Sequence, residues 1–191
     1  YGQNKKVPFE TTDNVDYPIS LYAATKKSNE LMAHTYGHLY DFKTTGLRFF
    51  TVYGPWGRPD MAYFLFAEAI SNNKRIKVFN NGNMHRDFTY IDDIVNGIVK
   101  ILESDITNRE HYKIYNIGNN KTETLKDFIK IIENSIGKKA KMDMLPMQPG
   151  DVYKTFANID ELKKDYNYSP KTNINKGIQL FVKWFLSYYK S

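Results

Sequence analysis

The segment PISLYAATKKSNE, residues 18–30, begins a helical pattern that runs from Ile19 to about Tyr40. Tyr22 and Lys26 are four residues apart, so on a helix their side chains share one face, about 5–6 Å apart between Cβ atoms. A phenol is a poor base at neutral pH, and a nearby ammonium favours the phenolate. The pair is therefore suited to proton transfer with a hydroxyl-bearing substrate. The same spacing also fits a lysine whose stem packs over a half-buried tyrosine.

Strand-like and helix-like segments alternate after this helix, which predicts an α/β fold. Apolar runs bounded by turn residues predict buried strands at 46–53 and 112–117. Residues 75–90 suggest a strand, an Asn-Gly turn and a second strand, and 139–146 suggest a short strand. Further helices are expected at 61–73, from Ile91, at 124–137, 159–167 and 173–190.

The composition is that of an ordinary globular protein, because 41% of the 191 residues are hydrophobic and 25% are charged. The net charge is +6, carried by scattered lysines. This pattern fits a solvated surface or a basic cleft for a small anion, and it does not favour nucleic-acid binding. There is no apolar run of about 18 residues, so no membrane association is expected. The absence of cysteine excludes disulfides and thiolate catalysis and fits a cytoplasmic protein.

Several separated segments together resemble one enzyme family. They are YG (1–2), PFE (8–10), YPISLYAATKKSNE (17–30), TGLRFFTVYGPWGRPDMA (45–62) and RDFTYIDDIV (86–95). The set resembles the extended short-chain dehydrogenase/reductase family, and more narrowly its NAD-dependent nucleotide-sugar epimerases. The long fourth segment is most similar to that of UDP-glucuronate 4-epimerases. The resemblance continues to residue 159 and so covers essentially the whole chain.

The resemblance implies the C-terminal part of a Rossmann-type doubly wound fold plus a small α/β substrate-binding domain. Residues 1–60 would be a remnant of the NAD-binding Rossmann domain. Residues 61–191 would be mainly the nucleotide-sugar-binding domain, with 86–120 returning to the Rossmann part. The sequence contains no glycine-rich dinucleotide-binding fingerprint. We therefore expect the N-terminal dinucleotide-binding half to be absent from this chain.

By the same resemblance, Tyr22 takes the proton from the sugar 4-hydroxyl while hydride passes to NAD. Lys26 holds the nicotinamide ribose and favours the phenolate, and Phe49 packs near the nicotinamide. The implied reaction converts UDP-glucuronate to UDP-galacturonate through a 4-keto intermediate. The open alternatives are another epimerase, dehydratase or decarboxylase of the family, or a non-catalytic UDP-sugar-binding or assembly module.

The resemblance also implies a set of substrate contacts. Thr51 and Arg58 would contact the sugar, and a guanidinium matches a carboxylate in bidentate geometry. The remaining implied contacts are Val78 and Phe79 for the uracil, Arg86 for the diphosphate and Asp151 for the uridine ribose. Some relatives carry an arginine three residues before this acid, where this chain has Gln148.

Other candidate residues have simpler interpretations. His34 and His38 have helical spacing, but without an evident third ligand they do not predict a metal site. Asp92 and Asp93 suit the first turn of a helix. The methionines at 142, 144 and 147 are expected to pack in the core.

The resemblance also sets expectations about partners. Without the pyrophosphate cradle the chain should bind NAD poorly and should not turn over substrate alone. The apolar faces that the absent half would cover favour association. We therefore expect a homodimer, or completion of the fold by the missing N-terminal half.

Overall fold

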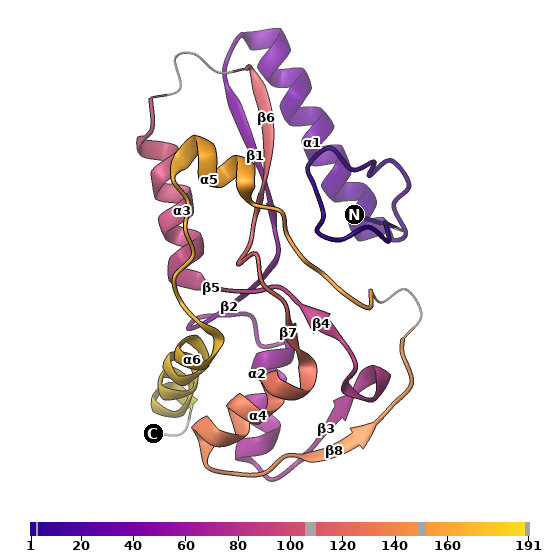
Figure 1. Ribbon diagram of the computed structural model, residues 1–191, viewed down its shortest axis with the longest axis vertical. Coiled ribbons are helices and arrows are strands. Elements are labelled where there is room, and N and C mark those ends of the chain that lie inside the picture. The colour runs from indigo at the N-terminus through magenta and orange to yellow at the C-terminus, as the bar shows by residue number, and fades with distance from the viewer. Residues whose placement is uncertain (3, 106–109, 149–151, 190–191) are drawn as a thin grey trace.

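The computed structural model describes residues 1–2, 4–105, 110–148 and 152–189 (Figure 1). The helices are α1 (Leu21–Tyr40), α2 (Ala62–Ser71), α3 (Ile91–Glu103), α4 (Leu125–Ile136), α5 (Asp160–Tyr166) and α6 (Ile174–Tyr189), with a 3-10 turn η1 (Phe79–Gly82). The strands are β1 (Thr44–Phe49), β2 (Thr51–Tyr53), β3 (Arg75–Val78), β4 (His85–Arg86), β5 (Phe88–Tyr90), β6 (Tyr112–Ile117), β7 (Glu123–Thr124) and β8 (Lys141–Met144). The alternation confirms the α/β class, and each predicted helix is present.

The strands pair mostly in parallel. Strand β1 pairs with β6, β2 with β5 and β3 with β8 in parallel, while β4 and β7 are antiparallel. Each parallel pair is joined by a long crossover that contains at least one helix, which is the connection that doubly wound folds use.

The single buried strand predicted at 46–53 is in fact two strands that flank Phe50. The N–H of Phe50 still donates to the carbonyl of Ile117 (3.0 Å), but beyond it the chain leaves β6 and pairs with β5. Strand β1 is also only half-buried, because within the described residues it has a neighbour, β6, on one edge alone.

The two strands predicted within 75–90 are present, but they do not pair with each other. Asn80 and Asn81 have left-handed backbone angles (φ 49° and 50°) inside η1, so the chain turns away instead of forming a hairpin. Strand β3 then pairs with β8 and β4 with β7, far along the sequence. The Asn-Gly signal therefore located the turn correctly but not the partners.

Helix α1 begins and ends at local signals. Ser20 accepts a hydrogen bond from the N–H of Ala23 (3.1 Å), as an N-cap should, and Asp41 ends the helix in a left-handed conformation. Gly37 is its one buried residue, and an added Cβ there would lie 3.4 Å from the Thr44 Oγ1 atom in β1. The helix therefore approaches β1 closely near its C-terminal end and is half-buried or exposed elsewhere.

Two hydrophobic clusters form the core. The larger lies among α2, α4 and α6 in the lower part of Figure 1, where Phe88 stacks on Phe128 with ring centroids 4.2 Å apart. The smaller lies between β6, α3 and α5 and contains Tyr115 and Ile117. Aromatic rings dominate the larger cluster, and they supply large buried areas with defined mutual geometry.

Two expectations about individual side chains need correction. Met142 packs against the larger cluster, but Met144 and Met147 are 49% and 38% exposed. Packing was the wrong prediction for those two. Met144 ends β8, which among the described strands pairs with β3 alone and lies at the edge of the molecule (Figure 1), and Met147 lies beyond the end of β8. Asp93 is in the first turn of α3, as predicted, but it is buried and accepts hydrogen bonds from the N–H groups of Lys171 and Thr172.

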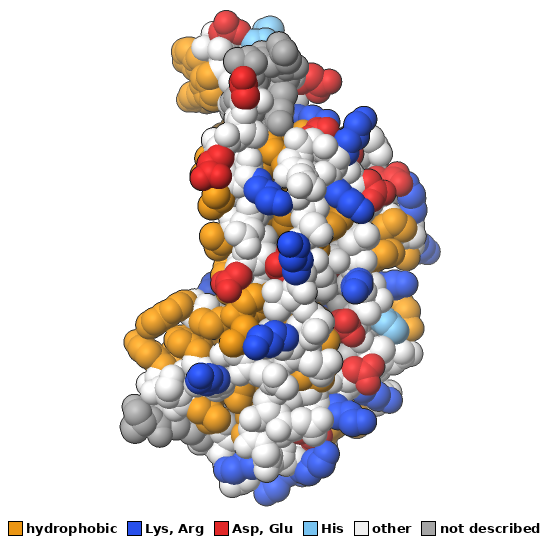
Figure 2. Space-filling model, turned by 60° about the vertical axis from the view of Figure 1, so that its left-hand side comes forward, with side chains coloured by type: hydrophobic (Ala, Val, Ile, Leu, Met, Phe, Trp, Pro, Cys, Tyr) orange, Lys and Arg blue, Asp and Glu red, His pale blue; other side chains and the backbone are white. Residues whose placement is uncertain are grey.

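The surface shows no stripe of one charge on the face in Figure 2, where basic and acidic side chains are interspersed. Hydrophobic side chains gather in the lower part of this face. None of the described helices combines the length and the apolar character needed to cross a membrane.

Candidate functional site

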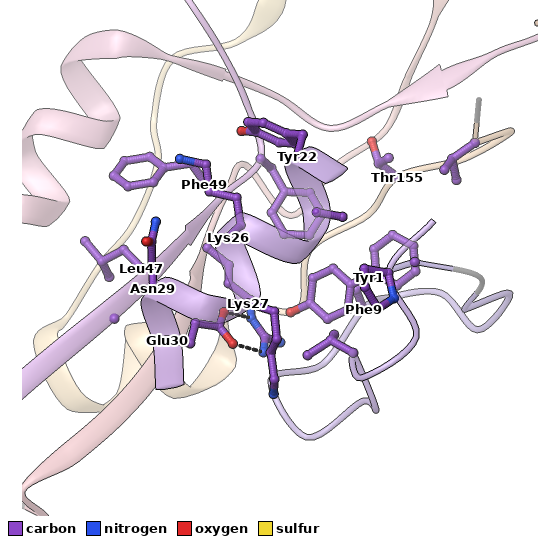
Figure 3. A pocket seen from close by; sticks show the side chains of 18 of the residues that line it. Tyr1, Phe9, Tyr22, Lys26, Lys27, Asn29, Glu30, Leu47, Phe49 and Thr155 are labelled. Atoms are coloured by element: carbon purple, nitrogen blue, oxygen red, sulfur yellow. Dashed lines mark hydrogen bonds and ion pairs between the residues drawn. The ribbon is translucent and has the colours of Figure 1, made fainter. Parts of the chain in front are cut away.

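A cavity of about 790 Å³ lies between the first half of α1, strand β1 and the N-terminal loop (Figure 3). Four residues predicted from the sequence line it: Tyr22, Lys26, Phe49 and Thr51. The structure therefore brings the whole predicted catalytic and nicotinamide set into one place. Thr51 is the one predicted substrate contact that joins them.

The Tyr22–Lys26 pair has the geometry that its spacing predicts. The Lys26 Nζ lies 5.3 Å from the centroid of the Tyr22 ring. Tyr22 is 71% exposed, so its phenol is accessible to a ligand in the cavity. A cation over an aromatic face attracts the ring electrostatically and holds the two side chains together. The pair is therefore preassembled.

Phe49 and Thr51 come from the ends of two strands. Phe49 closes β1 and is 52% exposed, so its ring is open to the cavity. The N–H of Thr51 donates to the carbonyl of Asp87 (3.2 Å), which fixes the start of β2 against the segment that precedes β5. The change of pairing partner at Phe50, from β6 to β5, thus determines the positions of the Phe49 and Thr51 side chains relative to α1.

A polar contact that sequence reasoning missed holds α1 to β1. Arg48 donates to both carboxylate oxygens of Glu30, at 2.7 Å and 3.0 Å (Figure 3). Burial works against the charged guanidinium, but the interactions with Glu30 and Tyr1 together outweigh it, so the pKa of Arg48 is raised above its ordinary value. Glu30 is four residues after Lys26 and eight after Tyr22, so it anchors the helix face that carries the pair.

The N-terminal loop closes the cavity on the far side of Arg48. The Tyr1 ring stacks on Phe9 with centroids 4.5 Å apart, and the Arg48 guanidinium carbon lies 5.0 Å from the Tyr1 centroid. The Tyr1 hydroxyl donates to Asn116 of β6. The spacing of Tyr22, Lys26 and Glu30 could have placed Glu30 on the face of the pair, but it carries no signal for Arg48 or for the N-terminal loop.

The predicted substrate residues Arg58, Val78, Phe79 and Arg86 do not line this cavity. Arg58 follows β2, is exposed, and forms a bidentate ion pair with Asp60 at 3.1 Å and 3.0 Å. Arg86 lies on β4, where it donates to the carbonyls of His85 and Tyr153. Asp151 lies outside the described residues.

Val78 and Phe79 stand at the junction of β3 and η1. The Val78 side chain is fully buried, and its carbonyl accepts a hydrogen bond from Leu145 (3.0 Å). A contact of Val78 with a ligand would therefore use its backbone groups and not its side chain.

Of the two histidines with helical spacing, His34 has an aromatic partner. His34 packs edge-on against Tyr112, with centroids 5.4 Å apart. Among the described residues, there is no group of three or more His, Cys, Asp or Glu side chains that could hold a metal ion.

The sequence of this chain matches the profile of the NAD dependent epimerase/dehydratase family over residues 1–118, which is more than half of its length. The chain belongs to the NAD-dependent epimerase/dehydratase family. The match includes α1 with its Tyr-Lys pair, β1 and β2, so it covers the three elements that carry the predicted catalytic set.

Individual family members extend the match over the whole chain. A Staphylococcus aureus protein called CapI is 54% identical over 100% of the chain. UDP-glucuronate 4-epimerase 2 of Arabidopsis thaliana is 45% identical, also over 100%. The chain spans 61% and 47% of the length of these two relatives.

A solved structure confirms the fold. The UDP-glucuronic acid 4-epimerase of Bacillus cereus, in complex with UDP-glucuronic acid and NAD, superposes with a TM-score of 0.88 at 32% identity. The match covers 97% of this chain and 59% of that structure. The expected Rossmann-type epimerase architecture is therefore confirmed, and the coverage accords with the expectation that the chain corresponds to part of it.

Proposed function

We propose that this chain carries the proton-transfer and substrate-binding part of an NAD-dependent UDP-sugar 4-epimerase that converts UDP-glucuronate to UDP-galacturonate. The observation that carries the proposal is the cavity shared by Tyr22, Lys26, Phe49 and Thr51. The relatives that bear UDP-glucuronate 4-epimerase names, and the Bacillus cereus complex with that sugar nucleotide and NAD, support the substrate.

Phe49 and Lys26 fit the nicotinamide end of the NAD cofactor. The exposed ring of Phe49 and the ammonium of Lys26 border the same cavity, which suits a flat nicotinamide and the hydroxyls of its ribose. The sequence has no glycine-rich turn that could hold the pyrophosphate. When bound, NAD supplies a reversible acceptor for the hydride of the sugar carbon.

In this reaction Tyr22 accepts the proton of the sugar 4-hydroxyl and later returns it. Lys26, above the ring of Tyr22, stabilises the negative phenolate that this transfer requires. Glu30 and Arg48 keep the helix face aimed at the cavity. Thr51 binds the sugar from the opposite wall.

The remaining contacts extend the proposal beyond the cavity. Arg58 binds the carboxylate of the sugar, and its ion pair with Asp60 shows that its guanidinium can already take the required bidentate geometry. Arg86 binds the diphosphate, Val78 and Phe79 seat the uracil, and Asp151 binds the ribose. Residues 1–60 and 86–120 belong to the Rossmann part in this proposal.

The test compares two proteins. One is the 191-residue chain, and the other, which we call the joined chain, is the same chain fused to the part of Staphylococcus aureus CapI that it does not match. Each is incubated with UDP-glucuronate and NAD, and the products are resolved by chromatography. We expect UDP-galacturonate from the joined chain alone. A UDP-pentose would show a decarboxylase instead, and no conversion of UDP-glucuronate by the joined chain would refute the assignment.

A second candidate function is a non-catalytic UDP-sugar-binding or assembly module. It is favoured by the position of Arg86, Val78 and Phe79 outside the cavity, with Val78 in the larger cluster. Calorimetric titration of the 191-residue chain with UDP tests this function directly. Binding of UDP together with an inactive joined chain would favour the module.

The exposed side of α1 supports association, either as a homodimer or with a completing N-terminal half. Leu31, Met32 and Leu39 are each more than half exposed on this helix. Sedimentation of the 191-residue chain and of the joined chain separates the two cases. A dimer in both proteins indicates self-association, and a dimer of the short chain alone indicates a surface that the added half covers.

A further inference from the structure

The buried carboxylate of Asp87 follows Arg86 in the sequence, and the mechanism above gives it no role. Asp87 is fully buried. Its Oδ1 accepts from the N–H of Asn119 (2.8 Å), and its Oδ2 accepts from the N–H of Ala157 (3.1 Å). In the part of the chain that the structure describes, no ion pair joins it to a cation. The carboxylate is therefore held by backbone donors from two separate segments.

The backbone of Asp87 forms hydrogen bonds with two residues that line the cavity. Its carbonyl accepts from the N–H of Thr51 (3.2 Å), and its N–H donates to the Thr155 hydroxyl (3.2 Å). Thr51 and Thr155 both line the cavity, although they are far apart in the sequence, and Figure 3 labels Thr155. Asp87 is thus bonded to both threonines through its main chain.

Asp87 also follows Arg86 directly, so the two share a peptide unit. The segment around Thr155 is bonded to the residue on the other side of Arg86, because His85 exchanges backbone hydrogen bonds with Tyr153 and Thr155 (both 3.0 Å). Together with the hydrogen bond from the Ala157 N–H to Asp87, these contacts hold residues 153–157 against residues 85–87. The orientation of Arg86 therefore depends on the same contacts as the cavity wall.

The space around the carboxylate allows little adjustment. A Cβ added to Gly118 would lie 3.2 Å and 3.4 Å from the two carboxylate oxygens and 2.8 Å from the Ala157 Cβ. The site therefore requires glycine at position 118. It also requires that both side-chain oxygens of residue 87 accept hydrogen bonds. An asparagine there would present an NH₂ group to one of the two backbone donors and leave that N–H unpaired.

We propose that Asp87 is a positioning residue that holds Thr51, Thr155 and Arg86 in register, so that the sugar end and the diphosphate end of a UDP-sugar are bound together. The proposal rests on the proposed function, because only there do Thr51 and Arg86 contact the ligand. The proposal predicts that loss of the Asp87 carboxylate weakens substrate binding. Tyr22 and Lys26 are on α1 and make no hydrogen bond with Asp87, so the chemical step is affected less than binding.

The test uses the joined chain with Asp87→Asn and a matched control, Asp93→Asn. Asp93 is also a buried carboxylate that accepts from two backbone N–H groups, but its partners Lys171 and Thr172 do not line the cavity. For Asp87→Asn we expect KM for UDP-glucuronate and the Kd for UDP to rise about tenfold, as expected for an unpaired buried donor, with kcat changed less. For Asp93→Asn we expect a loss of stability with KM unchanged.

Two further arms keep the test decisive. If Asp87→Asn does not fold, Gly118→Ala presses on the same carboxylate and should raise KM in the same direction. Gly137→Ala is the control: it has open space around its Cβ position but a left-handed φ of 76°, so it should lower stability without raising KM. An unchanged KM in Asp87→Asn or in Gly118→Ala, or an equal rise in Asp93→Asn, overturns the proposal. An unmodified joined chain that makes no UDP-galacturonate overturns the proposed function instead.

Discussion

Helices α1 and α6 differ in how they are held, although both are long. Helix α1 has 20 residues and buries only Gly37. Helix α6 has 16 residues and buries Ile174, Gly177, Ile178, Phe181, Val182 and Phe185. Burial of an apolar face therefore fixes α6, whereas the described contacts of α1 that fix its position are mainly polar, above all Glu30 with Arg48.

The comparison shows that Tyr22 and Lys26, the proposed proton-transfer pair, lie on the helix with fewer buried residues. The α2–α4–α6 region has a core of stacked and edge-on aromatic rings, such as Phe181 against Tyr63 (4.9 Å). The α1 region leaves Leu39 and Tyr40 exposed while it carries Tyr22 and Lys26. Stability and function are thus separable by substitution, and the predictions below test that separation.

Phe181→Ala should have the largest effect. The ring is fully buried and packs against four other aromatic rings, so its loss leaves a cavity and should lower the free energy of unfolding by about 3–5 kcal/mol. Urea unfolding followed by circular dichroism measures this. A change near zero would show that the α2–α4–α6 region is not the stable part of the molecule.

Asp87 should give the next largest effect, and it depends on pH. Burial raises the pKa of Asp87 from 3.8 to about 6. The folded state therefore binds this proton more tightly than the unfolded state, so the contribution of Asp87 is most favourable below pH 4. It is lost as pH rises from about 4 to 6, by roughly 3 kcal/mol in total.

The comparison with Asp87→Asn isolates this contribution from those of the other carboxylates. Urea unfolding of both proteins between pH 4 and 7 should show a difference in stability that shifts toward the variant as pH rises. A difference that stays constant across this interval would contradict a raised pKa at Asp87.

Glu30→Gln should have an intermediate and local effect. The pair with Arg48 is largely buried, with side-chain exposures of 19% and 15%, so removal of the charge should loosen α1 by about 1–3 kcal/mol. Hydrogen exchange should accelerate in α1 and leave the amides of α4 and α6 unchanged. The exposed pair of Lys27 with Asp16 offers a control, because Asp16→Asn should leave exchange in α1 nearly unaltered.

Leu39→Ala should have the smallest effect. Its side chain is 63% exposed on α1, so the free energy of unfolding should change by less than about 0.5 kcal/mol. A loss comparable to that of Phe181→Ala would mean that this face is covered in solution. That outcome would identify the side of α1 used for association.

Local patterns predicted much of this molecule. The extent of α1, the end of α4 at Gly137 and the spacing of Tyr22 and Lys26 each depend on residues within a few positions, and each is as predicted. The missed features join distant segments. Arg48 pairs with a residue 18 positions away, and Asp87 contacts residues 32 and 70 positions away.

Strand partners were missed for the same physical reason. The division of 46–53 into β1 and β2 follows from a change of partner between β6 and β5, for which the segment itself carries no signal. The domain boundary near residue 60 stays a prediction, and so do the ligand roles of Arg58, Arg86 and Asp151.

The central claim is that the Tyr22 phenol moves the proton of the sugar 4-hydroxyl, and the turnover of UDP-glucuronate by joined-chain Tyr22→Phe tests it most directly. The variant keeps the ring beneath Lys26 and removes only the hydroxyl. We predict that kcat falls about 10²–10⁴-fold, the usual contribution of a general base, while UDP binds as before. A kcat within a few-fold of the unmodified joined chain would contradict the account.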